Sequence, residues 1–556
     1  MFLASFAEIF SIGAVLPFLA TIVDPTKVFD HPSAIPFIKF LGISNPRDLI
    51  LPLSCAFGFA ALTAGSMRLI LLWASTRLSY AGGADISINI YWRTLHQPFS
   101  VHVNRNSSEM LDGISTKTNS AIYLINMTLN LISSSVMLIA ILITLIAIDF
   151  SIAFILFGGF GLIYLVILWL TRGRLFENSK TIAKESVNVI KSLQEGLGGI
   201  RDILLDGSQS IYCQIYRNAD QPLRLAQASN AFIGYGPRYG IEALGMILIA
   251  SLTYFLSLKD KDLSNAIPIL GSLALGAQRL LPLLQQIYGS YTGLKGGQES
   301  LKETLELLNQ PMPTYIEYPL FQPLSFKKQI ALKEISFRYS SETPLVLNGL
   351  NLIIEKGSCV GIMGTTGGGK STLLDIIMGL LTPTSGSLEV DGQLLDDSNC
   401  HSWQKHIAHV PQSIYLADST IEENIAFGVP KDQIDNELVH RAAQQAQISE
   451  SIESWPKKYK TFVGERGIRL SGGQRQRIGI ARALYKQADV IIFDEATSAL
   501  DNETELSVMS AIENLSNDLT IIIIAHRLST LKGCSQIFEL ANGNISRYGN
   551  YDKVIK

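Results

Sequence analysis

Long apolar runs dominate the first half of the chain. A helix needs about 20 consecutive, mostly apolar residues to cross a bilayer, and six runs come close to that length or exceed it. They cover residues 2–23, 49–78, 121–148, 150–170, 241–258 and 266–288. The pattern therefore predicts an all-α domain of six transmembrane helices over residues 1–295.

The first of these runs has an alternative interpretation as a signal peptide. It lacks a basic leading segment and a small-residue cleavage site, and further spans follow it, so we interpret it as a span. It begins at the second residue, with no polar segment before it. We therefore expect the natural chain to start further upstream.

The connections between the runs are unequal. Three are short, near Pro32, Asp149 and Lys259, whereas 79–120 and 171–238 are long and polar. The second long connection is rich in Lys and Arg, which favours the cytosolic side of the membrane. Apolar residues recur there at helical spacing, so we expect helices that continue well beyond the bilayer.

The pattern changes after a polar, proline-rich linker at 296–325. From residue 326 to 556, short apolar strands alternate with helices, which is typical of an α/β domain. The expected architecture is thus a six-helix membrane domain fused to an α/β nucleotide-binding domain.

A glycine-rich segment in this second domain fits the phosphate-binding loop pattern G-x-x-x-x-G-K-[ST]. An apolar strand precedes it and an apolar helix follows, which argues against a turn that binds nothing. Backbone N–H groups and the helix N-terminus would face the phosphates, Lys370 would reach the outer phosphates, and Ser371 would coordinate Mg²⁺. The predicted phosphate-binding residues are Gly364, Thr365, Thr366, Gly367, Gly368, Gly369, Lys370, Ser371 and Thr372.

Residues that suit phosphate chemistry occur at the ends of three further apolar strands. Asp494 and Glu495 end one strand, and we predict that Asp494 binds Mg²⁺ while Glu495 orients or deprotonates the attacking water. Gln412 would sense the γ-phosphate and contact the metal, and His526 would hydrogen-bond the γ-phosphate. Each alone has a structural alternative; their fixed order along the chain favours the functional interpretation.

Two other features have a functional and a structural interpretation. Ser471, Gly472 and Gly473 open a helix and could form a second anion-binding site. Tyr339 could stack on an adenine ring or simply pack across strands. A third feature, the histidine group 401, 406 and 409, fits no standard metal-ligand spacing.

Composition narrows the functional class. Apolar residues make up 47% of the 556 residues and charged residues 17%. The formal net charge of −3 gives no reason to expect a nucleic-acid partner. The five cysteines are scattered along the sequence, so we expect small buried apolar side chains and no disulfide framework.

The combined motifs resemble those of ATP-binding cassette (ABC) transporters, specifically exporters with six spans fused to one nucleotide domain. Leu470–Gln474 is similar to the family's signature motif, and Asp494–Asp501 to its Walker B and D-loop run. Thr461–Gly467 resembles the exporter form of the loop that communicates with the membrane domain. Essentially the whole chain takes part in the resemblance.

The resemblance implies an ATPase that works as a homodimer. ATP would lie between the phosphate loop of one copy and Ser471–Gln474 of the other, with Asp501 in the same interface. The ends of the long cytosolic connections, Pro98–Val103 and Ile200–Ile211, would couple the two domains. A soluble cassette ATPase is excluded by the spans, and nothing in the sequence suggests a gated channel.

Within the exporters, the membrane half resembles bacterial flippases for lipid-linked oligosaccharides. The resemblance rests on Phe6–Phe18, Gly236–Arg238 with Glu242, and Gln278–Pro282. It implies an inner-membrane flippase for an anionic lipid-linked oligosaccharide or another glycolipid. A peptide or other hydrophobic-substrate exporter is the alternative.

Arginines inside or near the predicted spans suggest where such a substrate would bind. Arg68, Arg238 and Arg279 could bind a pyrophosphate or other anionic head group. Alternatively, they pair with Glu8 or Glu242 or extend toward the membrane interface.

Overall fold

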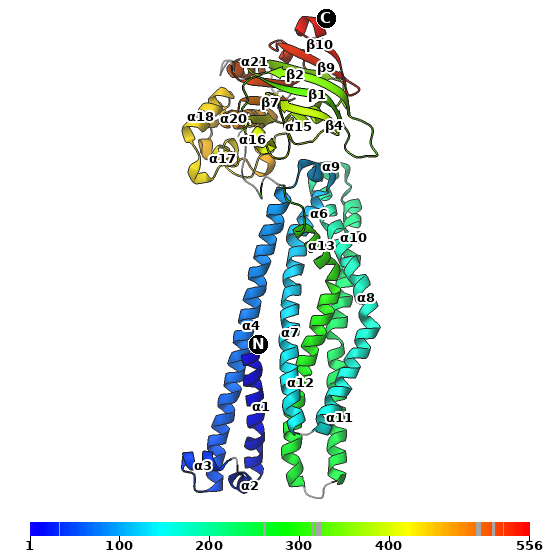
Figure 1. Cartoon of the computed structure of the whole chain (residues 1–556), viewed down its shortest axis with the longest axis vertical. Helices are drawn as coiled ribbons and strands as arrows, with labels where there is room; N and C mark the ends of the chain where they lie inside the picture. Colours follow the sequence, from blue (N-terminus) through cyan, green and yellow to red (C-terminus); the bar gives the residue numbers. More distant parts are fainter. Residues whose placement is uncertain are drawn as a thin grey trace. The chain divides into compact units, whose positions relative to one another are not determined.

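The computed structural model forms two compact units. It describes the chain except for residues 33, 149, 260–262, 314–315, 317–323, 496–501, 514–517, 526 and 556, and it describes no side chains for 151–157, most of 252–279 and a few single positions. The first unit comprises residues 1–96 and 105–311, and the second comprises residues 97–104 and 312–556. Figure 1 shows a helical first unit and a second unit built on β-sheets.

Long helices make up most of the first unit. They are α1 (Phe2–Val23), α4 (Ile50–Leu95), α7 (Thr118–Ile148), α8 (Phe150–Gly198), α10 (Gln209–Tyr235), α11 (Pro237–Lys259) and α12 (Leu263–Gly296). In the described part of the chain, four segments are long and apolar enough to cross a membrane: Phe2–Ile22, Pro46–Leu95, Ser107–Ala147 and Gly158–Gly198. The predicted spans 241–258 and 266–288 fall in α11 and α12, where many side chains are not described.

Shorter helices connect the long ones. They are α2 (Pro25–Phe29), α3 (Ile35–Leu41), η1 (Pro46–Leu49), α5 (Phe99–Asn104), α6 (Ser107–Asp112), the π-helix η2 (Gly113–Lys117), α9 (Ile200–Asp206) and α13 (Gln298–Leu308). α13 lies inside the segment that the sequence predicted to be a linker. One face of this helix is buried, through Ser300, Thr304 and Leu307. The prediction missed the helix because its overall composition is polar.

Two helices extend far beyond a bilayer. α4 has 46 residues and α8 has 49. At 1.5 Å per residue each is about 70 Å long, more than twice the roughly 30 Å of hydrocarbon in a bilayer. The long connections predicted from the sequence are therefore largely helical, as expected.

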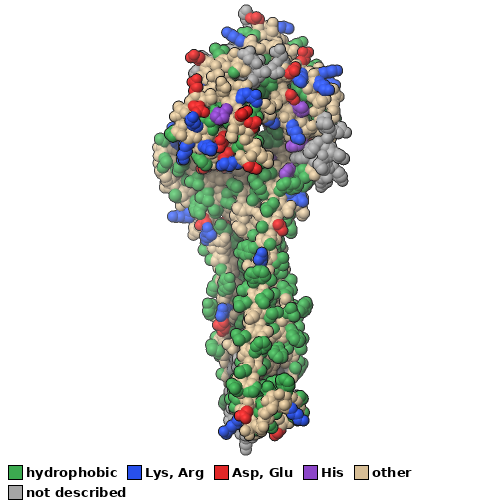
Figure 2. Space-filling model, turned by 90° about the vertical axis from the view of Figure 1, so that its left-hand side faces the viewer, with side chains coloured by type: hydrophobic (Ala, Val, Ile, Leu, Met, Phe, Trp, Pro, Cys, Tyr) green, Lys and Arg blue, Asp and Glu red, His purple; other side chains and the backbone are tan. Residues whose placement is uncertain are grey.

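The surface of the helical unit is apolar, as a lipid-facing surface must be. Figure 2 shows hydrophobic side chains over much of the visible face of this unit. On α4 and α8, Leu62, Trp73, Leu165 and Trp169 are all more than 60% exposed. Such exposure is costly in water but favourable against lipid tails.

A buried ion cluster joins the short helices to α8 and α13. The Lys117 ammonium lies 2.8 Å from the Glu303 carboxylate and 3.5 Å from the Asp112 carboxylate. Asp112 is fully buried and also accepts a hydrogen bond from Ser186. Because a buried charge needs a partner, this cluster fixes how α6, η2, α8 and α13 meet.

The second unit contains two sheets. The antiparallel sheet has the order β2-β1-β4-β5, and the larger sheet has the order β10-β9-β3-β8-β7-β6. The first comprises β1 (Gln329–Phe337), β2 (Leu347–Glu355), β4 (Ser385–Val390) and β5 (Gln393–Leu394). The second comprises β3 (Cys359–Gly364), β6 (Ile407–Val410), β7 (Val490–Asp494), β8 (Thr520–Ile524), β9 (Gln536–Ala541) and β10 (Asn544–Gly549).

Helices cover the sheets. They are α15 (Lys370–Ile377), α16 (Cys400–Lys405), α17 (Ile421–Ile425), α18 (Asn436–Gln445), α19 (Ser449–Glu453), α20 (Gly472–Tyr485), α21 (Asn502–Glu513) and α22 (Tyr551–Ile555), with single turns η3 (Lys431–Gln433), η4 (Lys458–Lys460), η5 (Glu465–Gly467) and η6 (Leu528–Leu531). Alternate residues of β7 enter two cores: Ile491 and Phe493 join the core with α18 and α20, whereas Ile492 joins the core with α15 and the antiparallel sheet.

The parallel register of the larger sheet aligns strand ends. Ile524 pairs with Ile362 of β3 on one side and with Asp494 of β7 on the other, and Phe493 pairs with Val410 of β6. The carboxyl ends of β3, β6, β7 and β8 therefore lie along one edge. The segments that follow these strands carry the sequence motifs.

Replacing Lys117 with Met should destabilise the helical unit by about 3 kcal/mol, because it leaves Asp112 buried without its cation. The measurement is the thermal midpoint of the purified protein in detergent. Lys191→Met is the matched control, since Lys191 and its partner Glu195 are both half exposed and 3.9 Å apart, a pair worth less than about 1 kcal/mol. Equal midpoints for the two variants would contradict the role assigned to the cluster.

Candidate functional site

The predicted phosphate loop connects β3 to α15 through two positions that require glycine. Gly364 has φ +148°, and a Cβ there would lie 2.1 Å from the Leu540 carbonyl oxygen. Gly369 has φ +92°, and its Cβ would lie 2.8 Å from the Leu347 side chain. A side chain at either position would displace the loop from the adjacent backbone. The glycines thus let the loop close tightly over the strand end.

Lys370 is held inside this loop. It is the first residue of α15, is buried, and donates from Nζ to the carbonyl oxygens of Gly364 at 2.9 Å and Thr365 at 3.0 Å. The loop therefore combines a fixed ammonium with the N-terminus of an eight-residue helix. Both attract an anion, which is the chemistry that phosphate binding requires.

Two carboxylates lie at the end of β7, and that of Asp494 interacts with the Lys370 ammonium. Asp494 is the last strand residue, and Glu495 follows with φ +51°, a backbone conformation that residues other than glycine seldom adopt. The Glu495 N–H donates to the Ile524 carbonyl at 3.0 Å. Its carboxylate accepts a hydrogen bond from the Gln412 side-chain amide at 2.7 Å. The structure thus brings the predicted residues Gln412 and Glu495 into direct contact.

The surroundings disfavour ionisation of Asp494 and of Asp375 on α15. Burial raises the pKa of Asp494 and neighbouring Glu495 adds to this, whereas Lys370 and a hydrogen bond from Ser371 oppose it. Burial, with the charge of Asp494, raises the pKa of Asp375 on α15 to about 6. A cation bound here would relieve both effects. The Ser371 hydroxyl and the Asp494 carboxylate already touch, so the pair fits one small oxygen-preferring cation such as Mg²⁺.

Tyr339 lies beside the first turn of α15. Its hydroxyl and that of Thr372 are 2.9 Å apart, and its ring meets Phe337 edge-on with centroids 5.0 Å apart. The side chain is 40% exposed. Packing against Phe337 therefore leaves part of the ring accessible, and adenine stacking stays a prediction.

The second predicted anion site opens α20. Ser471 is its N-cap and forms a capping box with Gln474: the Gln474 N–H donates to Ser471 Oγ at 3.2 Å, and the Ser471 N–H donates to Gln474 Oε1 at 2.9 Å. Gly472 and Gly473 occupy the first turn, so no side chain covers it. The cap holds a 14-residue helix with its N-terminus exposed.

Some predicted residues cannot be placed. His526 and Asp501 lie outside the described residues, as does the side chain of Arg279. Among the histidines, His406 contacts Asp489 and the Leu324 carbonyl. Among the described residues, no group of three or more potential metal ligands from His, Cys, Asp and Glu is present.

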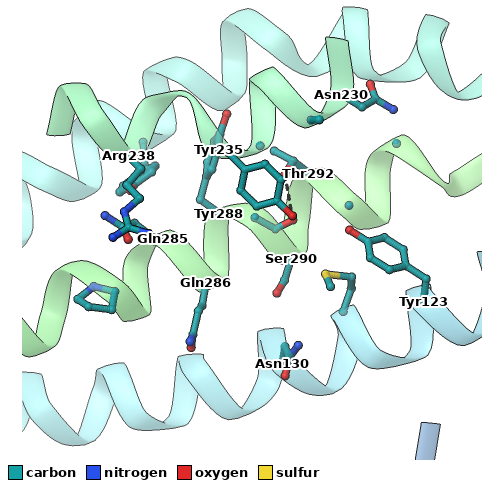
Figure 3. Close-up of a pocket in the computed structure, with 18 of the residues that line it drawn as sticks. Tyr123, Asn130, Asn230, Tyr235, Arg238, Gln285, Gln286, Tyr288, Ser290 and Thr292 are labelled. Carbon is teal, nitrogen blue, oxygen red and sulfur yellow. Dashed lines mark hydrogen bonds between the residues drawn. The ribbon is translucent and has the colours of Figure 1, made fainter. Parts of the chain in front are cut away.

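The helical unit contains a cavity of about 1100 Å³ between α7, α8, α10, α11 and α12. Figure 3 shows that uncharged hydrogen-bonding side chains project into it from several of these helices. Among its described lining residues, only Arg238 and Glu242 carry a charge. The uncharged polar lining includes Tyr123, Asn130, Asn230, Tyr235, Gln285, Gln286, Tyr288, Ser290 and Thr292.

Glycines on α12 and just after it allow a close approach to α7 beside this cavity. A Cβ at Gly293 would lie 3.1 Å from the Tyr123 hydroxyl, and one at Gly297 would lie 2.8 Å from the Leu124 side chain. Asn230 and Gln286 are fixed by hydrogen bonds from Asn178 at 2.8 Å and Ser134 at 2.9 Å. The polar lining is therefore held in place.

Of the three arginines predicted to bind substrate, the two with described side chains, Arg68 and Arg238, have acidic partners. Arg68 forms an ion pair with the buried Glu8 and is not part of the cavity lining. Arg238 lines the cavity, and its Nε lies 2.7 Å from Glu242, which also accepts from Gln285 at 3.4 Å. The sequence allowed pairing with Glu8 or Glu242 as the alternative to substrate binding, and the structure contains these ion pairs at both Arg68 and Arg238.

Sequence reasoning missed Asp375 and the amide and tyrosine lining of the cavity. Asp375 follows Ser371 by four positions, so its helical spacing is a signal that could have identified it. The amide and tyrosine residues named above are spread over several helices and belong to none of the sequence motifs. Only the assembled helices bring them together.

Comparisons with known proteins agree with this geometry. Residues 347–498 match the family model described as ABC transporter. The chain is similar over its full length to a solved bacterial Atm1-family ABC exporter with ATP bound, with a TM-score of 0.82, 23% identity and coverage of 95% of that chain. The chain therefore has the ABC exporter fold and carries an ABC transporter nucleotide-binding domain.

Curated relatives include transporters. The chain is 34% identical over 379 residues to the ATP-dependent lipid A-core flippase of Saccharophagus degradans, covering 66% of this chain and 63% of that protein. It is 36% identical over 281 residues to the heterocyst differentiation ATP-binding protein HepA of Nostoc sp., covering 50% and 45%. The chain thus spans less than two thirds of the length of these relatives.

Replacing Asp375 with Asn should stabilise the protein in the absence of nucleotide at neutral pH. Because the folded pKa is raised to about 6, the unfolded chain releases this proton first, and stability falls as the pH rises from about 4 through about 6. Because Asn cannot ionise, the substitution removes this effect of the raised pKa and should increase the free energy of unfolding by roughly 1–3 kcal/mol.

The measurement is the thermal midpoint between about pH 4 and about pH 8. The variant should be more stable than the wild type above about pH 6 and should lose most of the difference at the acid end. Asp397→Asn, at an exposed carboxylate, should leave the profile unchanged. An identical decline in wild type and Asp375→Asn would contradict the assignment.

Proposed function

We propose that the chain is an ATP-driven membrane exporter of the flippase type, with its ABC domain in the cytoplasm. One observation carries the proposal: the parallel sheet brings Lys370, Ser371, Gln412, Asp494 and Glu495 together at one edge, in a chain that also has a lipid-facing helical unit with a polar cavity. The ABC exporter fold and the flippases among the relatives support it.

The residues of the site divide the work of hydrolysis. The phosphate loop and Lys370 hold the phosphates, and the Gln412 amide orients the Glu495 carboxylate. Glu495 then takes the proton of the attacking water. Ser371 and Asp494, with Gln412, would hold Mg²⁺, which when bound neutralises charge on the phosphates. His526 would hydrogen-bond the γ-phosphate.

The proposed working unit is a homodimer. Ser471, with the exposed N-terminus of α20, offers an anion site that one copy would present to ATP held by the other. Gln474 and Asp501 would lie in the same interface. Each dimer would then have two identical composite sites.

Coupling to the membrane unit would run through the ends of the cytosolic helices. Residues 97–104, which contain the predicted coupling segment Pro98–Val103, form a compact unit with residues 312–556. This grouping supports a role in transmitting movement from the nucleotide site. Ile200–Ile211 covers α9 and the start of α10.

For the substrate we propose an anionic lipid-linked oligosaccharide or another glycolipid. Amide and hydroxyl groups in the cavity suit the many hydroxyls of a saccharide, and tyrosine rings suit its apolar faces. Among the described lining residues, Arg238 is the cation available to an anionic head group if it exchanges Glu242 for the substrate. A peptide exporter is the alternative, because amide side chains also bind peptide groups.

Replacing Glu495 with Gln should reduce ATP turnover by at least about 100-fold, because the general base is lost, while ATP binding persists. Turnover by the purified protein and binding of a fluorescent ATP analogue measure the two effects. Glu503→Gln, at an exposed position of α21, should retain wild-type turnover. Normal turnover by the Glu495 variant would refute its role as the general base.

Replacing Arg238 with Gln should lower flipping of a fluorescent lipid-linked oligosaccharide in reconstituted vesicles by about ten-fold, the effect of one charged hydrogen bond. ATP hydrolysis should fall less than transport. Arg224→Gln is the control, since Arg224 pairs with Asp220 at an exposed site on α10. Undiminished flipping by the Arg238 variant would remove it from the substrate site, and no flipping by an active wild-type ATPase would reject the glycolipid substrate.

A further inference from the structure

Two cysteines that are far apart in sequence meet in the second unit. Cys359 is the first residue of β3, and Cys534 lies two residues before β9. Their sulfur atoms are 3.1 Å apart, and neither forms a disulfide. From the sequence, all five cysteines were expected to act as small buried apolar side chains. The fold instead places these two thiols within reach of each other.

The surrounding backbone fixes this approach. The Cys359 carbonyl accepts hydrogen bonds from the Ser535 N–H at 2.8 Å and from the Ser535 hydroxyl at 2.9 Å. A Cβ at Gly361 would lie 3.4 Å from the Cys534 sulfur and 2.8 Å from Leu531. Residues 359 and 361 share one face of the strand, and Gly361 leaves that face open. The Cys534 sulfur therefore lies over β3 beside Cys359.

The pair is separate from the nucleotide site. Cys359 begins β3, and Gly364 at its other end begins the phosphate loop. Five residue steps of about 3.3 Å place the two ends roughly 17 Å apart. Chemistry at the cysteines thus need not touch a bound nucleotide.

We propose that Cys359 and Cys534 form a peroxide-sensitive, reversible disulfide. Cys359 is partly exposed whereas Cys534 is buried, so Cys359 reacts first. Its thiolate attacks one oxygen of hydrogen peroxide, the O–O bond breaks, and a sulfenic acid and hydroxide form. The Cys534 thiolate then attacks the Cys359 sulfur, the S–O bond breaks, and a second hydroxide leaves. In total, two thiols and one peroxide give one disulfide and two waters.

The second thiol determines what oxidation does to the domain. A sulfenic acid without a nearby thiol is oxidised further to sulfinic acid, which ordinary thiols do not reverse. With Cys534 beside it, Cys359 is diverted into a disulfide that cellular thiols reduce. The bridge also connects residues 175 positions apart, and such long-range links restrict the unfolded chain. Oxidation should therefore make the domain more resistant to heat.

The other three cysteines differ from this pair in their surroundings and in their expected reaction with peroxide. Cys400 donates to the Gly379 carbonyl at 3.0 Å, and burial, with the charges of Asp397 and Asp396, raises the pKa of its thiol to about 11. It should stay reduced. Cys55 and Cys213 are exposed in the helical unit and could cross-link separate molecules. A Cys55→Ser, Cys213→Ser background removes that side reaction.

The test treats this full-length background protein in detergent with hydrogen peroxide, blocks remaining thiols and identifies peptides by mass spectrometry. The expected product is a 359–534 linked peptide that dithiothreitol releases, with Cys400 unmodified. The thermal midpoint should rise by at least about 2 °C on oxidation and return on reduction. In Cys534→Ala, Cys359 should instead accumulate sulfinic acid.

Two results would overturn the proposal. In the first, peptide mapping of the background protein, which retains both Cys359 and Cys534, finds Cys359 oxidised to sulfinic acid and no linked peptide. The other is an equal rate of sulfinic acid formation at Cys359 with and without Cys534. The first result needs no substitution in the pair, so a folding defect in Cys534→Ala cannot obscure it.

Discussion

The parallel register of β3, β8, β7 and β6 is the constraint on which the nucleotide site depends. Because Ile524 pairs with Ile362 on one side and with Asp494 on the other, the strands end together, and the segments after them share one edge. A slip of one residue would move Asp494 to the opposite face of β7 and remove it from Lys370 and Ser371. The buried Ile and Val side chains of both sheet faces oppose such a slip.

The helical unit satisfies a different constraint, since lipid offers no hydrogen bonds. Its backbone is therefore helical, and its described internal charges lie near opposite charges, as in Arg68 with Glu8 and Lys117 with Glu303. Many of its uncharged polar side chains line one cavity. This arrangement is compatible with the proposed binding of a polar head group, because the polar lining is internal while much of the outer surface is apolar.

The division between what the sequence predicts and what it leaves open follows from how local each signal is. Gly364–Thr372 is recognisable because contiguous residues make the whole loop, and the long apolar helices follow from composition. The contact between Gln412 and Glu495 could be expected from strand ends in a parallel sheet. The cavity amides, the ion cluster around Lys117 and the Cys359–Cys534 pair could not, because each depends on helices or strands that meet only in three dimensions.

In the proposed homodimer, each chain holds half of each ATP site. Lys370→Ala disables the phosphate loop, and Ser471→Arg blocks the N-terminus of α20; each variant alone should be inactive. In a mixed dimer both defects fall in one composite site and the other is intact, so ATP turnover should reappear when the two variants are co-assembled. Turnover in the purified mixed dimer that stays at the level of the single variants would contradict the shared site.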